Sequence, residues 1–311
     1  MHQSDLFVWD FWYHYDSESK LFHVIYLNAD ASLVPTNEHH FHARLGYAVT
    51  QDFDGIDWID HDVFHADSHG WDNTSIWSGD VIKTADGFLL FYTSRNRSID
   101  DGMTQNVGMA RSTDFIHWDR IDGIRIEPDP RWYEPRNLEP DGDDTTHAWR
   151  DPFLFIHDGI AHMVLAAKSR ESPICRKGAI AVLRAREDDL TDWEVLPPLC
   201  SPGWYSEMEV PQIYERPEGG LVLVFSTWAR GDHAPTTNGQ GGLHAINIDK
   251  IEPHDLGDIV PKVLLPASDG LYACRIIPEL DGEIVGFDTE RGGWRRSGRK
   301  TYLKSINREF G

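Results

Sequence analysis

Short apolar runs rich in β-branched and aromatic residues recur along the chain, and each follows a turn of acidic residues or glycine. The runs cover residues 21–27, 88–93, 160–165, 221–226 and 284–287, and their starts lie 67, 72, 61 and 63 residues apart. The preceding turns include Asp86-Gly87, Asp158-Gly159 and Asp281-Gly282. A strand, a turn of this type and a second strand are typical of a β-hairpin. The pattern therefore predicts five hairpins of similar size.

A third strand is expected in most units, because a glycine after the hairpin opens another apolar run that leads to a tryptophan. The tryptophans are Trp58, Trp118 and Trp193, and we interpret them as packing residues of an outer strand. The fourth unit keeps the glycine, Gly242, without a following tryptophan. Helical periodicity is confined to one possible turn at residues 187–190.

Five antiparallel units of roughly 60 residues, with no helices between them, predict an all-β fold, a five-bladed β-propeller. One or two β-sandwiches are the alternative. A sandwich does not explain why every unit keeps an ionisable residue six to nine positions before its turn. These residues are Asp10, Asp80, Asp151, Glu209 and Arg275. We expect residues 1–311 to form a single propeller domain.

The first strand of each propeller blade lines the central channel, so these five ionisable residues are expected to converge at one mouth of that channel. The loops between second and third strands open at the same mouth and form a pocket wall. The sequence predicts long loops at residues 28–44, 94–106, 168–177, 229–241 and 289–299.

Composition and charge exclude several kinds of partner. The chain has 311 residues, 40% of them hydrophobic, and a formal charge of −22 from 51 acidic and 29 basic residues. Nucleic acids and anionic membranes require a basic footprint, so neither is expected as a partner. Three scattered cysteines form neither a disulfide framework nor a zinc motif. We see no signal peptide and no run of 18 apolar residues, and we expect a cytoplasmic protein.

The motifs around the converging residues resemble those of the furanosidase clan that includes invertases and levansucrases, glycoside hydrolase families 32 and 68. The resemblance covers essentially the whole chain, one motif per unit. The motifs are Val8-Trp9-Asp10-Phe11-Trp12, Trp77-Ser78-Gly79, Arg150-Asp151-Pro152, Glu207-Met208-Glu209-Val210-Pro211 and Asp269-Gly270-Leu271-Tyr272-Ala273. Two positions depart from the family pattern: Asp80 stands where a serine is usual, and Val210 where a cysteine or arginine is usual.

The resemblance implies three catalytic residues. Asp10 matches the nucleophile, Glu209 the acid/base and Asp151 the carboxylate that holds the furanose hydroxyls. Glycosidic cleavage requires one carboxyl group that protonates the leaving oxygen and another that attacks the anomeric carbon or activates water. Crowding among Asp10, Asp151 and Glu207 is expected to raise the pKa of Glu209, which must carry the proton, whereas Asp10 must be ionised.

Further residues are candidates for substrate binding, each with a structural alternative. Trp9 and Trp77 are either stacking platforms or core residues, and Asp80 and Glu207 either contact the sugar or support the site. Arg275 binds a hydroxyl or, as we slightly favour, neutralises Asp151 or Glu207. The full set of substrate-binding candidates is Trp9, Trp77, Ser78, Asp80, Arg150, Glu207, Tyr272 and Arg275.

Three other clusters are interpreted as surface features, and no metal or cofactor is expected. Three histidines in the first long loop have a spacing that allows a metal, but a solvated loop is the better interpretation. An acidic cluster is read as a surface turn. A basic run at the fifth loop lies at the expected pocket mouth, where it could bind a phosphate on the substrate, but a solvated loop is the better interpretation. These clusters are His39, His40 and His42; Asp141, Asp143 and Asp144; and Arg291, Arg295, Arg296, Arg299 and Lys300.

The predicted function is a retaining glycoside hydrolase that cleaves terminal β-fructofuranosides, such as sucrose or a short fructo-oligosaccharide, through a covalent ester on Asp10. Three alternatives remain open: an inverting propeller enzyme of the arabinofuranosidase and xylosidase type, a fructosyltransferase, and a non-catalytic sugar-binding propeller. The expected partner is a small carbohydrate, and the sequence leaves the oligomeric state open.

Overall fold

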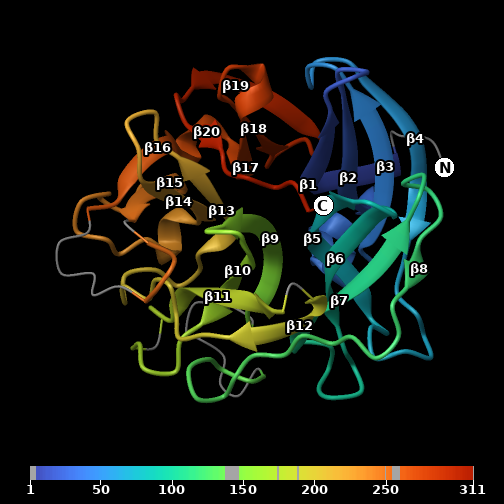
Figure 1. Ribbon diagram of the computed structural model, residues 1–311, viewed down its shortest axis with the longest axis horizontal. Coiled ribbons are helices and arrows are strands. Elements are labelled where there is room, and N and C mark those ends of the chain that lie inside the picture. Colours follow the sequence, from blue (N-terminus) through green and yellow to red (C-terminus); the bar gives the residue numbers. More distant parts are fainter. Residues whose placement is uncertain are drawn as a thin grey trace.

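The computed structural model describes residues 5–136, 147–173, 175–187, 189–248, 250–253 and 260–310. Its strands form five antiparallel sheets, which stand around a central channel as the blades of a propeller (Figure 1). The predicted five-bladed β-propeller is therefore confirmed, and the β-sandwich alternative was wrong.

Each blade is built from strands that follow one another in sequence, and the fourth sheet gains one further strand, β20 (Lys304–Ser305), from near the end of the chain. The first contains β1 (Leu6–Asp16), β2 (Leu21–Asp30), β3 (Arg44–Thr50) and β4 (Ile56–Phe64), the second β5 (Ser75–Thr84), β6 (Gly87–Arg95), β7 (Gln105–Ser112) and β8 (Asp119–Arg120), and the third β9 (Trp149–His157), β10 (Ile160–Lys168), β11 (Gly178–Arg186) and β12 (Asp189–Val195). The fourth contains β13 (Glu209–Glu215), β14 (Leu221–Thr227), β15 (Gly242–Ile248) and β16 (Lys262–Pro266), and the fifth β17 (Leu271–Ile277), β18 (Glu283–Asp288) and β19 (Trp294–Lys300). Short 3-10 helices lie in the connections: η2 (Ala31–Thr36), η3 (Glu38–Phe41), η4 (Ala229–Gly231), η5 (Ala267–Asp269) and η6 (Pro278–Leu280).

The hydrophobic core lies between neighbouring blades. One buried cluster joins Ile82 and Phe91 of the second blade to Leu154 of the third. Another joins Val182 of the third blade to Phe225 of the fourth. Because each sheet buries its faces against the next one, no blade is stable alone, and the ring of first strands is fixed by packing on all sides.

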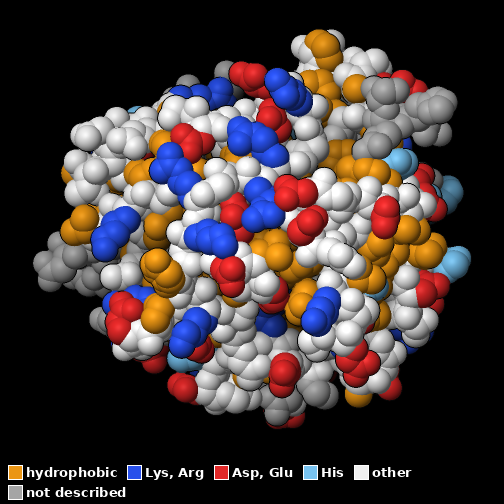
Figure 2. All heavy atoms as spheres, turned by 90° about the horizontal axis from the view of Figure 1, so that it is seen from above, with side chains coloured by type: hydrophobic (Ala, Val, Ile, Leu, Met, Phe, Trp, Pro, Cys, Tyr) orange, Lys and Arg blue, Asp and Glu red, His pale blue; other side chains and the backbone are white. Residues whose placement is uncertain are grey.

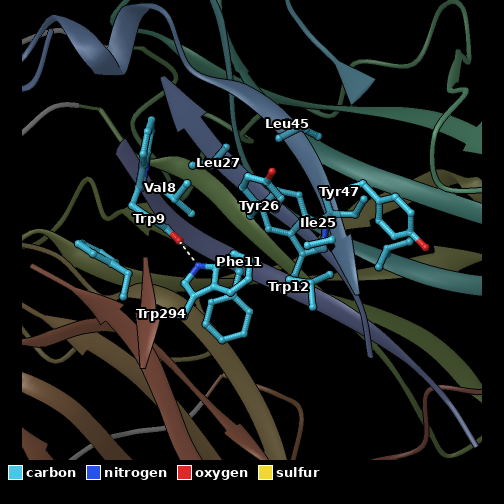
Figure 3. Packing of buried hydrophobic residues seen from close by; sticks show 14 of the residues in the cluster. Val8, Trp9, Phe11, Trp12, Ile25, Tyr26, Leu27, Leu45, Tyr47 and Trp294 are labelled. Carbon is cyan, nitrogen blue, oxygen red and sulfur yellow. Dashed lines mark hydrogen bonds between the residues drawn. The ribbon is translucent and has the colours of Figure 1, made fainter. Parts of the chain in front are cut away.

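Aromatic packing closes the ring where the fifth blade meets the first. The indole of Trp294 on β19 donates to the carbonyl oxygen of Trp9 at 2.8 Å, as Figure 3 shows. The Trp294 ring also lies 5.1 Å from the rings of Phe11 and Trp58. Trp58 lies on the outer strand β4 and Trp193 on β12, which confirms their packing role.

A C-terminal segment crosses from the fourth blade to the second. Strand β20 (Lys304–Ser305) pairs with β13. The carbonyl of Asn307 then accepts from the backbone N–H of Ile156 at 2.8 Å, and Arg308 pairs with Asp80. Figure 1 places this end of the chain near the centre of the ring. The segment thereby connects three blades at the channel.

Two predictions about local structure were wrong. The one helical turn that the sequence allowed at residues 187–190 does not form, because strand β12 begins at Asp189. The fifth loop is shorter than predicted, because Arg295, Arg296, Arg299 and Lys300 belong to strand β19. These cations pair with acidic neighbours, for example Arg299 with Asp269 at 2.8 Å. Figure 2 shows that basic and acidic side chains are interspersed on one face of the molecule.

Two further observations bear on the sequence predictions. The acidic cluster Asp141, Asp143 and Asp144 lies outside the described residues. In the described ranges, all helices are too short to cross a lipid bilayer.

Candidate active site

The five first strands share one irregularity at the same mouth of the channel, a β-bulge. Pairing with the second strand shifts register between Val8 and Phe11 on β1, and between Trp77 and Gly79 on β5. The other three strands shift at residues with positive φ: Asp151 (58°), Val210 (49°) and Ala273 (46°). A bulge re-aims the side chains next to it. The residues beside these five bulges form the candidate site.

Asp10 on β1 and Asp151 on β9 both form hydrogen bonds with residues of neighbouring blades. Ser78 Oγ donates to Asp10 Oδ2 at 2.5 Å. The backbone N–H of Val210 donates to Asp151 Oδ2 at 3.0 Å, and the N–H of Asp151 itself donates to Thr93 Oγ1 at 3.1 Å. These contacts fix both carboxyl groups with hydrogen bonds from neighbouring blades.

Glu209 joins the same group of side chains through Arg150 and Tyr272. Arg150 Nη2 lies 2.9 Å from Glu209 Oε1 and 3.0 Å from Glu207 Oε2, and its Nε lies 3.8 Å from Asp151 Oδ2. Tyr272 Oη donates to the other oxygen of Glu209. Arg150 therefore contacts three carboxyl groups from one position.

Burial and mutual repulsion perturb the carboxyl groups. Burial, and after it the charge of Asp151, raises the pKa of Asp10 from 3.8 to about 7, although the hydrogen bond from Ser78 opposes the rise. Burial also raises the pKa of Asp151 to about 6, against the opposing charge of Arg150. Asp10 and Asp151 are thus the carboxyl groups whose pKa burial and neighbouring charges raise, whereas the rise expected from the sequence at Glu209 stays a prediction.

Trp9 and Trp77 form an aromatic wall at the first two bulges. Trp9 is almost fully buried, and its ring lies 5.3 Å from the ring of His39. The indole of Trp77 donates to the carbonyl of His40 at 2.8 Å, and the guanidinium of Arg95 lies 4.9 Å from the Trp77 ring centroid. These contacts hold the first two motifs in place beside Asp10.

The histidine loop was predicted to be solvated, and this was wrong for His39, which is buried against Trp9 and Phe7. Burial, and then the neighbouring His39, lowers the pKa of His40 to about 3, so His40 is neutral at pH 7. The physical reason is that the loop folds into η3 over the aromatic wall instead of extending into solvent. No metal-like cluster of His, Cys, Asp and Glu occurs in the part of the chain that the structure describes.

Three candidates have contacts that give them supporting roles. Both oxygens of Asp80 are engaged, by the Leu154 N–H at 2.8 Å and by Arg308 at 2.6 Å, so Asp80 lies outside the acid cluster. Glu207 lies between Arg150 and Lys168, both at 3.0 Å. Arg275 donates to the carbonyl of Phe11 and is one of the charges that oppose the rise in pKa of Asp10 and Asp151, whose largest cause is burial.

Two residues near the cluster were not found by sequence reasoning. Thr93 holds the backbone of Asp151, and Trp228 stacks on Tyr272 with ring centroids 3.8 Å apart. Both occur at or just after the end of a predicted strand, at the mouth where long loops begin. Their position at the end of a predicted strand was the sequence feature that could have marked them as site residues.

The sequence matches the model of the glycosyl hydrolases family 32 N-terminal domain over residues 17–242. The chain belongs to this family. The matched residues include Asp151 and Glu209, whereas Asp10 and Tyr272 lie outside them.

Two curated relatives of this family 32 chain are named as enzymes that act on sucrose or sucrose phosphate. The chain is 28% identical over 186 residues to sucrose-6-phosphate hydrolase from Bacillus subtilis (strain 168), a match that covers 58% of this chain and 34% of that protein. It is 25% identical over 295 residues to an extracellular sucrase from Zymomonas mobilis, which covers 78% of this chain and 66% of that protein. The chain thus spans about a third of the Bacillus subtilis protein and about two thirds of the Zymomonas mobilis protein.

A solved structure supports the family's fold. Inulosucrase from Halalkalicoccus jeotgali bound to kestose superposes with a TM-score of 0.68 at 21% identity, over 92% of this chain and 77% of that one. This likeness shows the propeller architecture.

Proposed function

We propose that the chain hydrolyses terminal β-fructofuranosides, such as sucrose or a short fructo-oligosaccharide, with retention of configuration. The observation that supports this most is the arrangement at the channel mouth, where Asp10, Asp151 and Glu209 are electrostatically coupled within one cluster. Membership of family 32 and the sucrose-cleaving relatives give the chemical class. A carbohydrate-binding scaffold does not require three carboxyl groups at one point, one of them buried and two partly buried, because their repulsion costs stability.

In the first step, an oxygen of Asp10 attacks the anomeric carbon and forms an ester. The glycosidic C–O bond breaks, its electron pair stays on the leaving oxygen, and Glu209 transfers its proton to that oxygen. In the second step, Glu209 removes a proton from water, the water oxygen attacks the anomeric carbon, and the ester bond to Asp10 breaks. Glu209 ends protonated and Asp10 ionised, as at the start.

The neighbours of these two residues suit the proposed steps. The hydrogen bond from Ser78 stabilises the ionised form of Asp10, which is the attacking form. Tyr272 and Arg150 hold the two oxygens of Glu209 in one orientation. Asp151 accepts from the Val210 N–H through one oxygen, which leaves acceptor capacity for furanose hydroxyl groups.

The test compares the wild-type chain with Asp10→Asn and Glu209→Gln on sucrose and on aryl β-fructofuranosides. We expect each substitution to lower kcat at least about a thousandfold without unfolding the protein. Glu209→Gln should lose less on an aryl substrate, because a good leaving group needs no protonation. Wild-type activity in Asp10→Asn would refute the assignment.

The stereochemistry of the first product separates the alternatives. Retention, seen as β-fructofuranose by NMR before mutarotation, supports the ester mechanism, whereas inversion supports the arabinofuranosidase-type alternative. Longer oligosaccharides at high sucrose concentration indicate a fructosyltransferase. Tight binding without turnover of any furanoside indicates a sugar-binding propeller.

A further inference from the structure

A partly exposed tryptophan stands next to the proposed acid. Trp228 follows the last residue of β14, and 38% of its surface is exposed. Its ring stacks on Tyr272 with an interplanar angle of 14°, and Tyr272 in turn donates to Glu209. A single side chain therefore separates Trp228 from the carboxyl group that would protonate the leaving oxygen.

Hydrogen bonds within the chain hold the loop that carries Trp228 in place. The Gly231 N–H donates to the Trp228 carbonyl at 3.0 Å, and the Ser206 N–H donates to the Gly231 carbonyl at 2.9 Å. Further along, the buried carboxylate of Asp232 accepts from Thr237 Oγ1 at 2.7 Å and from the Gly241 N–H at 3.1 Å. A Cβ at position 231 would overlap Ser206 Oγ, so the hydroxyl of Ser206 would have to turn away from any larger residue there. The indole is thus presented by a preorganised loop.

The position of Trp228 assigns it to one side of the substrate. Glycosidic cleavage puts the bond to be broken between the sugar held at Asp10 and Asp151 and the oxygen protonated by Glu209. Whatever is attached to that oxygen lies on the side of Glu209. The wall there is the Tyr272–Trp228 stack, whose outer indole is accessible. An accessible indole offers a flat apolar surface to a ring, and burial of that surface contributes to binding.

We propose that Trp228 is the platform of the leaving-group subsite and selects leaving groups that present the apolar face of a six-membered ring. A hexopyranose or an aryl group fits this description, and a small acyclic alcohol does not. The proposal rests on the proposed function, because it places the leaving group from the role of Glu209. It adds the chemical class of the group that departs.

The test measures kcat and KM of the wild type, Trp228→Ala and Trp228→Phe on two substrates. Sucrose has a ring as leaving group, and methyl β-fructofuranoside has only methanol. For Trp228→Ala we expect kcat/KM on sucrose to fall about tenfold, mainly through KM, with methyl fructofuranoside changed less than about twofold. Trp228→Phe should recover most of the loss, because it restores a ring at the same place. Tyr302→Ala removes a fully accessible aromatic side chain, 89% exposed, and should leave both substrates unaffected.

The outcomes separate the platform from a structural role. An equal loss on both substrates, with a shifted pH profile, would mean that Trp228 acts by positioning Tyr272 and Glu209, and would overturn the proposal. No loss on either substrate would overturn it as well. If the wild-type chain cleaves neither substrate, the proposed function itself fails and the subsite assignment fails with it.

Discussion

Replacing Asp10 by asparagine should stabilise the protein at alkaline pH. The pKa of Asp10 rises from 3.8 to about 7 on folding, chiefly through burial and then through the charge of Asp151. The folded state therefore keeps a proton that the unfolded chain releases at pH 4 to 7. Stability falls as the pH rises through this window, and the loss is complete above the folded-state pKa. Asparagine has nearly the same shape, cannot ionise and still accepts from Ser78.

The magnitude follows from the two pKa values. A difference of about three pH units corresponds to ~4 kcal/mol, because each unit is worth ~1.4 kcal/mol. This is an upper bound, since Asp10 is partly exposed at the channel mouth and water reduces the penalty. We expect Asp10→Asn to exceed the wild type by about 1–3 kcal/mol at pH 8, and the two proteins to be about equal at pH 4.

Urea unfolding at pH 4, 5, 6, 7 and 8 measures this difference. Asp16→Asn is the matched control at the far end of β1, because hydrogen bonds from Ser19 and Glu18 lower the pKa of the exposed Asp16. Its stabilising contribution is present at neutral pH and is lost on acidification, so the control should be less stable than the wild type at pH 8. If Asp10→Asn is no more stable than the wild type at pH 8, desolvation and the charge of Asp151 do not destabilise the ionised Asp10 carboxylate.

Three further predictions concern the site and its supports. The rate constant kcat/KM should fall about tenfold per pH unit below pH ~7, because Asp10 must be ionised. Ser78→Ala should move this acidic limb of the pH profile to higher pH, because it removes the hydrogen bond that lowers the pKa of Asp10. An acidic limb that does not move contradicts the role of the hydrogen bond. Arg308→Met should lower the free energy of unfolding in urea by about 3–5 kcal/mol, because it removes the cation from the fully buried Asp80. Adding Asp80→Asn should recover much of this loss of stability. A loss below ~1 kcal/mol argues against a stabilising Arg308–Asp80 pair. Gly79→Ala should cost about 1–3 kcal/mol, because its Cβ would overlap the Phe91 carbonyl oxygen, whereas Gly55→Ala, with open space around it, should be neutral in the same thermal unfolding assay.

The alignment of the five units from the sequence was correct in three of them and displaced in two. The number of residues before the turn predicted that Asp10, Asp151 and Glu209 lie at the channel mouth, and in the structure these residues lie at the bulges there. In the second and fifth units the same rule selected Asp80 and Arg275, whereas the bulges lie at Ser78 and after Tyr272. Two or three residues along a strand move a side chain one layer deeper into the channel. The bulge, which turn spacing does not encode, sets the position of each site residue.

The amino-acid pattern by itself determined the repeat, the hairpins and the five-bladed ring, because alternating apolar runs and glycine turns act over a few neighbouring residues. It also marked Asp10, Asp151 and Glu209 as candidate site residues, because each lies in a motif that resembles those of the family. Only the tertiary structure decided that Arg150 pairs with Glu207 and Glu209, that Arg308 neutralises Asp80, and that Trp228 covers Tyr272. These contacts join different blades, and their distances follow from how the blades pack around the channel.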